Sequence, residues 1–331
     1  MNPSVHRVMP VFATAAVFLV GFLVCSLAYP NFASMRVVMN LLTDNAFLGI
    51  VAVGMTFVII SGGIDLSVGS VIGFTTVFVA LAIERWGLSP PAAFVTVLIL
   101  SALFGATMGA TIEYFDLPPF IVTLAGMFLA RGASFLLSTE SVPISAEFYS
   151  HLADIAIALP GGARFTVPAM IMVAVVIIGA VLLHFTRFGA NVYALGGSRA
   201  ATALMGVNVT RTTVLIYTLS GLLAGLSGIV FSLYTSSGYS LSAVGVELDA
   251  IAAVVIGGTL LSGGYGFVFG TFLGVLIQGL IQTYISFDGS LSSWWAKIAT
   301  GLLLFGFIAF QQIMLKLARR PRHRAAGAIH A

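Results

Sequence analysis

Long runs of apolar residues, separated by short polar segments, follow one another along almost the whole chain. About 20 consecutive apolar residues are enough for a helix to cross the hydrocarbon core of a bilayer. The pattern predicts helices near residues 8–29, 44–60, 66–85, 91–112, 118–137, 165–185, 212–235, 250–262, 266–285 and 294–313. The expected fold class is therefore all-α, with residues 1–331 forming a single polytopic membrane domain of about ten transmembrane helices.

The composition agrees with this interpretation. Of 331 residues, 59% are hydrophobic and only 8% are charged. So few charges leave too little polar surface to cover a soluble globule of this size, and no span-free stretch is long enough to suggest a soluble domain. Cys25 is the only cysteine, and the five histidines are scattered, so neither a disulfide within the chain nor a metal-binding cluster is expected.

The distribution of positive charge predicts the orientation in the membrane. Arg187, Arg199 and Arg211 share one loop, and the C-terminal tail from Lys316 to Arg324 is basic. Several loops on the other side are acidic, and residues 138–164 and the stretch containing Glu247 belong to these. Because loops rich in Lys and Arg stay in the cytoplasm, we expect both termini to be cytoplasmic.

Two glycine-broken segments interrupt the apolar pattern. Residues 61–70 read SGGIDLSVGS, and residues 256–264 read IGGTLLSGG; each follows a short apolar run and precedes a glycine-containing one. Irregular backbone at membrane depth is tolerated where protein buries it or where it lines a water-filled cavity. Corresponding broken segments in two halves of a membrane protein are typical of a transport pathway. The alternative is that the small residues only allow close helix packing.

We therefore predict a translocation pathway near these two hairpins. The residues expected to form it are Asn45, Ser61, Gly62, Gly63, Asp65, Ser67, Gly69, Gly257, Gly258, Thr259, Ser262 and Gly263. Most of their polar groups are uncharged, which suits a neutral polar solute such as a polyol better than an ion. Asp65 has a second possible role, because its carboxylate can cap a helix beginning at Leu66 through the amides of Ser67 or Val68.

Arg131 lies inside the predicted span 118–137. A charged side chain at this depth needs a partner or an interfacial position.

The loop 186–211 is the longest predicted cytoplasmic segment. Ser198 is placed to cap a short helix that runs through Met205, and Gly206 is placed to end it. An isolated helix of this length is marginal in water, so a partner protein is expected to cover it.

No catalytic motif is evident in the sequence. Residues 258–263 have the glycine spacing of a phosphate-binding loop, but Gly264 stands where that loop requires lysine. We expect the chain to have no catalytic residues, no metal site and no cofactor of its own, and not to be an enzyme.

Three motifs together resemble the permease subunits of bacterial sugar ABC importers of the ribose type. They are SGGIDLSVG at 61–69, GGSRAA at 196–201 with MGV at 205–207, and IGGTLLSGG at 256–264, and the resemblance covers residues 35–313. Within that family the chain is most similar to a permease of the bacterial galactofuranose importer. The segments that carry this closer resemblance are 40–49, 245–251, 277–285 and 288–295.

The resemblance implies an ABC importer permease fold in the bacterial inner membrane. It implies a second, different permease subunit, two copies of an ATP-binding module that bind ATP-Mg, and a periplasmic protein that delivers the sugar; lipid is expected around the complex, and no nucleic acid. The loop 186–211 becomes the segment that couples the permease to the ATPase. Its coupling residues are then Arg199, Ala200, Ala201, Leu204, Met205, Gly206 and Val207.

Other functions stay open at this point. The same importer family also carries ribose and other sugars, so the cargo can differ from galactofuranose. An ion-coupled secondary transporter would also fit two broken hairpins, although the intramembrane acid or histidine chain that it needs is missing. A membrane enzyme is the least favoured alternative, because no nucleophile, base or metal set falls at one depth.

Overall fold

The computed structural model describes the backbone of residues 3–319 and, apart from Ala153, the side chains of residues 11–313. Its helices are α1 (Pro3–Ala28), α2 (Met35–Asp44), α3 (Ala46–Ile60), α4 (Val68–Glu84), α5 (Pro90–Tyr114), α6 (Pro119–Leu137), α7 (Glu147–Asp154), α8 (Val167–Phe185), α9 (Arg187–Gly197), α10 (Arg199–Leu204), α11 (Val209–Thr235), α12 (Val246–Ile256), α13 (Val268–Asp288) and α14 (Trp294–Arg319). Short antiparallel pairs join β1 (Val142–Pro143) to β4 (Ser237–Gly238) and β2 (Ala156–Leu159) to β3 (Ala163–Thr166), with the 3₁₀ turn η1 (Pro160–Gly162) between β2 and β3.

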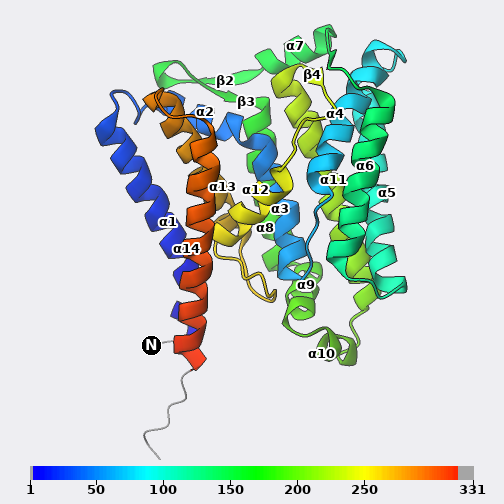
Figure 1. Ribbon diagram of the computed structural model, residues 1–331, viewed down its shortest axis with the longest axis vertical. Helices are drawn as coiled ribbons and strands as arrows, with labels where there is room; N and C mark the ends of the chain where they lie inside the picture. The colour runs from blue at the N-terminus through cyan, green and yellow to red at the C-terminus, as the bar shows by residue number, and fades with distance from the viewer. Residues whose placement is uncertain (1–2, 320–331) are drawn as a thin grey trace, which may run out of the picture.

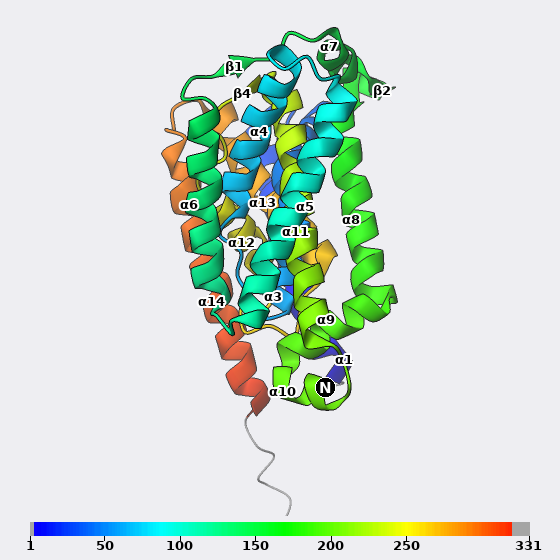
Figure 2. The same cartoon turned by 90° about the vertical axis from the view of Figure 1, so that its right-hand side faces the viewer.

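The long helices lie roughly side by side along one axis of the molecule (Figure 1). The strands and α7 gather at one end, which we call the α7 end, and α9 and α10 lie at the other, the α10 end. The view turned by 90° shows the same separation, with α8 and α6 on opposite sides (Figure 2). α1 begins and α14 ends at the α10 end (Figure 1).

The prediction of an all-α membrane fold is confirmed. Within residues 3–319, seven helices are long and apolar enough to cross a membrane, and an eighth span results if α2 and α3, bent by 57°, count as one. Each of the ten expected segments contains a helix, but α4 and α12 are short. These two helices are short because non-helical backbone, at residues 61–67 and 239–245, precedes each of them.

Both ends of one expected span differ from the structure. The span predicted over 250–262 begins earlier, at Val246, and ends at Ile256. Gly258 follows with a φ of 94°, a left-handed conformation that ends the helix and that glycine adopts at little cost. Glu247, expected in an outer loop, therefore lies in the first turn of α12.

α3 forms the centre of the molecule. All of its residues except Phe47 are buried, because α8, α11, α12 and α13 surround it. A helix that is apolar on every side is typical of a protein core or of a membrane span, and α3 occupies the core. The hydroxyls of Thr56 on α3 and Thr271 on α13 are 2.7 Å apart and hydrogen-bond to each other, which satisfies both groups inside the core.

Small residues allow α5 and α11 to pack closely. A Cβ at Gly105 would overlap the carbonyl of Tyr217, and one at Gly221 would overlap the carbonyl of Ser101. The GxxxG spacings in these helices thus serve packing.

Candidate functional site

The first glycine-broken segment turns at the end of α3 and then runs extended to α4. The amides of Gly62 and Gly63 donate to the carbonyls of Ile59 and Val58, both at 2.9 Å. Gly62 is exposed and has a φ of 86°, a conformation that glycine adopts readily. The carbonyl of Ile64 then accepts hydrogen bonds from Thr123 on α6 at 3.2 Å and from Tyr217 on α11 at 3.4 Å. The extended segment is therefore held on both sides.

Asp65 is completely buried in this segment. Its Oδ1 accepts from the amide of Ser67 at 3.0 Å and from the Ser67 hydroxyl at 2.6 Å. Its Oδ2 accepts from Ser220 Oγ on α11 at 2.7 Å. The helix begins at Val68 rather than at Leu66, so Asp65 precedes the cap position, and its carboxylate joins the segment to α11.

The second glycine-broken segment connects α12 to α13. Here the amide of Leu260 donates to the carbonyl of Tyr265 at 3.1 Å, and Gly263 and Gly264 have φ values of 80° and 75°. Thr14 on α1 donates to the carbonyl of Ile256 at 2.6 Å, and Gln311 on α14 donates to the carbonyl of Val255 at 3.2 Å. Both ends of the polypeptide thus contribute to holding the end of α12.

The two segments touch each other at the α10 end. The amide of Gly264 donates to the carbonyl of Ile60 at 2.8 Å, and a Cβ at Gly263 would lie 3.0 Å from the Cα of Gly62. The weak sequence similarity between the segments thus corresponds to a direct backbone contact. We call this contact, formed by residues 60–63 and 262–266, the hairpin junction.

The predicted pathway residues do not form one cluster. Ser61, Gly62, Ser262 and Gly263 lie at the hairpin junction and are partly or fully exposed. Gly257, Gly258 and Thr259 are buried beside α13, and a Cβ at Gly257 would overlap Gly270. Asn45 lies at the other end of α3, which spans 15 residues and thus about 22 Å. Its Nδ2 donates to the Leu41 carbonyl at 2.9 Å at the bend between α2 and α3.

The start of α4 meets the start of α12 near the middle of the molecule. A Cβ at Gly69 would overlap the Glu247 carboxylate, and one at Gly73 would lie 2.5 Å from Nη1 of Arg131. The Arg131 guanidinium donates to the carbonyls of Ser240 and Ser242 and interacts electrostatically with Glu247. Arg131 thus has its backbone partners in the turns that precede α12, far away in sequence. Sequence analysis identified Arg131 as a charge in need of a partner and did not identify Glu247.

The predicted coupling loop is largely helical. Ser198 caps α10 by accepting from the Ala201 amide at 3.3 Å, and Gly206 ends this region with a φ of 80°. α9, which sequence analysis read as loop, precedes it and has Thr186 as its cap. The predicted coupling residues Ala200, Ala201, Leu204, Met205 and Gly206 are exposed, whereas Val207 is half-buried.

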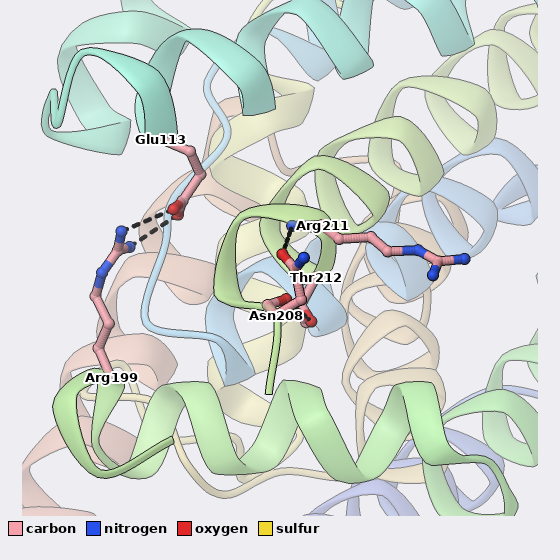
Figure 3. Close-up of polar contacts among 5 residues, drawn as sticks. All are labelled: Glu113, Arg199, Asn208, Arg211 and Thr212. Carbon is pink, nitrogen blue, oxygen red and sulfur yellow. Dashed lines mark hydrogen bonds and ion pairs between the residues drawn. The ribbon is translucent and has the colours of Figure 1, made fainter. Parts of the chain in front are cut away.

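An ion pair fixes α10 to the membrane helices. The guanidinium of Arg199 binds both carboxylate oxygens of Glu113, at the end of α5, at 2.8 and 2.7 Å (Figure 3). The Glu113 side chain is only 2% exposed, so the pair is shielded from water on that side. Asn208 caps α11 by accepting from the Arg211 amide at 2.8 Å, and the Arg211 side chain points away from the Arg199–Glu113 pair (Figure 3).

The end of α10 exposes large apolar side chains. Leu204 is 90% exposed and Met205 is 68% exposed. α10 lies beyond the ends of α5 and α6 (Figure 1). Leu204 and Met205 belong to the loop that a partner protein is expected to cover, and that contact stays a prediction.

Comparison with known proteins agrees with this geometry. Residues 37–308 match the protein family described as the permease component of branched-chain amino acid transport systems. The chain is 59% identical over 308 residues to the inner membrane ABC transporter permease protein YjfF of Escherichia coli, with 93% of each chain covered. It belongs to the ABC importer permeases. No solved structure matches it.

Two further relatives place this permease among sugar importers. The fructose import permease protein FruG of Bifidobacterium longum is 36% identical over 316 residues, with 94% of this chain and 92% of that protein covered. The ribose import permease protein RbsC of Escherichia coli is 38% identical over 290 residues, which is 86% of this chain and 88% of that protein. The permease is thus a multi-pass inner-membrane subunit of the sugar-importer family, and such a permease works with ATPase and binding-protein partners.

Proposed function

We propose that this permease forms one half of the transmembrane path of an ATP-driven galactofuranose importer. The observation that carries the proposal is the meeting of the two glycine-broken hairpins at the α10 end, where α9 connects them to α10 and its exposed apolar surface. A transporter needs irregular backbone at the path and a surface on which its motor acts, and this arrangement supplies both.

The path itself is proposed to lie on the face seen in Figure 1. The non-helical segments 61–67 and 239–245 run there, between α14 on one side and α6 on the other. Ser61, Gly62, Ser262 and Gly263 are the accessible residues of the predicted pathway. Asp65, Ser67 and Thr259 are buried, and we assign them to holding the path in shape.

The assembly is proposed to contain a second, different permease, two ATP-binding modules and a periplasmic sugar-binding protein. ATP-Mg would be bound by the ATP-binding modules. The α10 end would face the cytoplasm, because Arg187, Arg199 and Arg211 belong to it. α1 would then begin and α14 would end on the cytoplasmic side, which supports the proposal that both termini are cytoplasmic (Figure 1). The basic tail from Lys316 to Arg324, which contributed to the expected orientation, has side chains outside the described residues.

Transport would follow from a shift between two states of the permease pair. ATP would favour the state in which the ATP-binding modules are closed. Movement of α10 would then shift the permease pair toward its corresponding state. The shift requires ATP to bind one state more tightly than the other, since equal affinity for both states moves no equilibrium. Sugar would then cross a cavity that need not bind it tightly.

The choice of galactofuranose is supported by the segments 40–49, 245–251, 277–285 and 288–295, which resemble the galactofuranose importer's permease. Ribose and fructose are the alternatives, because relatives named for those sugars share more than a third of the sequence.

Uptake measurements decide between these cargoes. Labelled galactofuranose uptake is measured in a strain that lacks the gene, with and without the gene restored, in the presence of excess galactopyranose or ribose. We expect restored uptake that resists both competitors. Restored transport of ribose or fructose alone would keep the importer and change the cargo. No restored transport of any sugar, with the permease and its partners present in the membrane, would contradict the proposed function.

A further inference from the structure

We propose that Tyr193 and Gly196 on α9 are positioning residues that transmit movement of α10 to both hairpins at once. The inference rests on the proposed function and adds to it the route by which the motor reaches the path. α9 precedes α10 in the chain, and only Ser198 separates the two helices. α9 also lies against the hairpin junction, so that one short helix touches both the coupling surface and the path.

Gly196 makes the closest approach of α9 to the junction. A Cβ at this position would overlap the carbonyl of Ile60 and would lie 2.5 Å from the amide of Gly264. These two groups form the hydrogen bond that joins the hairpins. The backbone of α9 therefore packs directly on that bond. Main-chain contacts of this kind allow little relative movement of α9 and the junction, because no flexible side chain lies between them.

Tyr193 supplies a second connection one turn earlier on the same face of α9. Its hydroxyl donates to the carbonyl of Gly266 at 2.6 Å. The neighbouring ring of Phe267 stacks on His184 at the end of α8, with centroids 5.4 Å apart and planes 5° apart. The second hairpin is thus attached to α9 by a hydrogen bond and to α8 by an aromatic contact.

The other side of α9 keeps it attached to the membrane helices. Val192 is fully buried and Leu195 is 7% exposed, and both belong to the hydrophobic core that contains Ile60. A cavity of about 500 Å³ lies beside the helix and is lined by His184, Ala190, Tyr193, Tyr265 and Phe267, among others. The cavity gives α9 space into which it can shift, and the contact of Gly196 with the hairpin junction would transmit that shift.

Adjacent glycines provide a matched test. Gly196→Ala forces a methyl group into the junction, whereas no atom lies within 4 Å of a Cβ at Gly197, so Gly197→Ala is the control. Both variants are reconstituted in proteoliposomes with the partner permease, the ATPase and the sugar-binding protein. We expect Gly196→Ala to lower the sugar moved per ATP hydrolysed by about tenfold, the size of a typical coupling between sites. Gly197→Ala is expected to match the parent.

A distance measurement separates transmission from a simple structural role. Spin labels on Ser61→Cys and Ser262→Cys, one on each hairpin, report the hairpin separation with and without vanadate-trapped nucleotide. We expect the distance to change on trapping in the parent and in Gly197→Ala, and to stay constant in Gly196→Ala. Normal sugar transport per ATP and a normal distance change in Gly196→Ala would overturn the inference.

Tyr193→Phe covers the case in which Gly196→Ala does not assemble. It removes only the hydroxyl that reaches Gly266, so the helix and its core contacts remain. A weaker coupling of hydrolysis to transport supports the inference, and unchanged coupling overturns it. If the parent complex itself moves no sugar on ATP addition, the proposed function fails, which is a different result from normal transport in the variants.

Discussion

Asp65 is a buried carboxylate whose hydrogen-bond donors come from two distant parts of the chain. Two are provided by Ser67, and the third comes from Ser220 on α11. A carboxylate removed from water is tolerated when its oxygens are satisfied in this way. Its role in the described structure is therefore to fix the extended segment 61–67 against α11, and any effect on transport would act through that segment.

Substitutions at Asp65 test this role. Asn keeps an acceptor for Ser67 and can donate to the Ser220 hydroxyl, so Asp65→Asn should cost about 1 kcal/mol of stability. Leucine leaves the donors on Ser67 and Ser220 without an acceptor, and each unsatisfied donor should lower the free energy of unfolding by about 1–3 kcal/mol. Thermal unfolding in detergent should therefore give the parent the highest melting temperature, Asp65→Asn a slightly lower one and Asp65→Leu a much lower one. Transport rates should follow the same order. Equal loss of transport in two stably folded variants would instead assign the role to the negative charge.

At the scale of elements, glycine decides which helices come close. Gly105 and Gly221 bring the backbones of α5 and α11 together, and α11 in turn holds the first hairpin through Tyr217 and Ser220. The same reasoning applies to α12 and α13, where Gly274 faces the carbonyl of Ala253. Packing between helices thus determines where the hairpins lie.

Gly105→Ala should destabilise the permease. The added methyl group overlaps the Tyr217 carbonyl, and overpacking of this kind costs about 1–3 kcal/mol. Gly132→Ala on α6 is the matched control, because a Cβ there meets nothing within 4 Å. Thermal unfolding in detergent should show a lower melting temperature for Gly105→Ala alone. A control that unfolds as early as Gly105→Ala would contradict the packing account.

At the scale of the whole molecule, the permease has the proposed coupling surface at one end and two glycine-broken hairpins inside. α10 exposes Leu204 and Met205 on that surface, and the Arg199–Glu113 pair connects it to α5. A force on α10 is thus passed to α5 as well as to α9. This arrangement suits a subunit that is moved by another protein.

Ala201→Glu tests that arrangement in the assembled complex. Ala201 is exposed in the middle of α10, so glutamate there should leave membrane insertion and folding intact while disturbing the surface that the ATPase contacts. We expect sugar-stimulated ATP hydrolysis to become uncoupled from transport, whereas Ala201→Ser should behave as the parent. Normal sugar-stimulated ATP hydrolysis and transport in Ala201→Glu would show that α10 does not belong to the coupling surface.

The sequence alone determined the fold class, the positions of the ten helical segments and the local turns. Apolar runs of membrane length, the cap at Ser198 and the glycine turns at Gly62 and Gly206 are all consequences of neighbouring residues. Only the tertiary structure decided which distant groups meet. The Ile60–Gly264 hydrogen bond, the Asp65–Ser220 contact and the carbonyl partners of Arg131 join residues more than 100 positions apart. Such pairs depend on how whole helices pack, and no local pattern of residues records that packing.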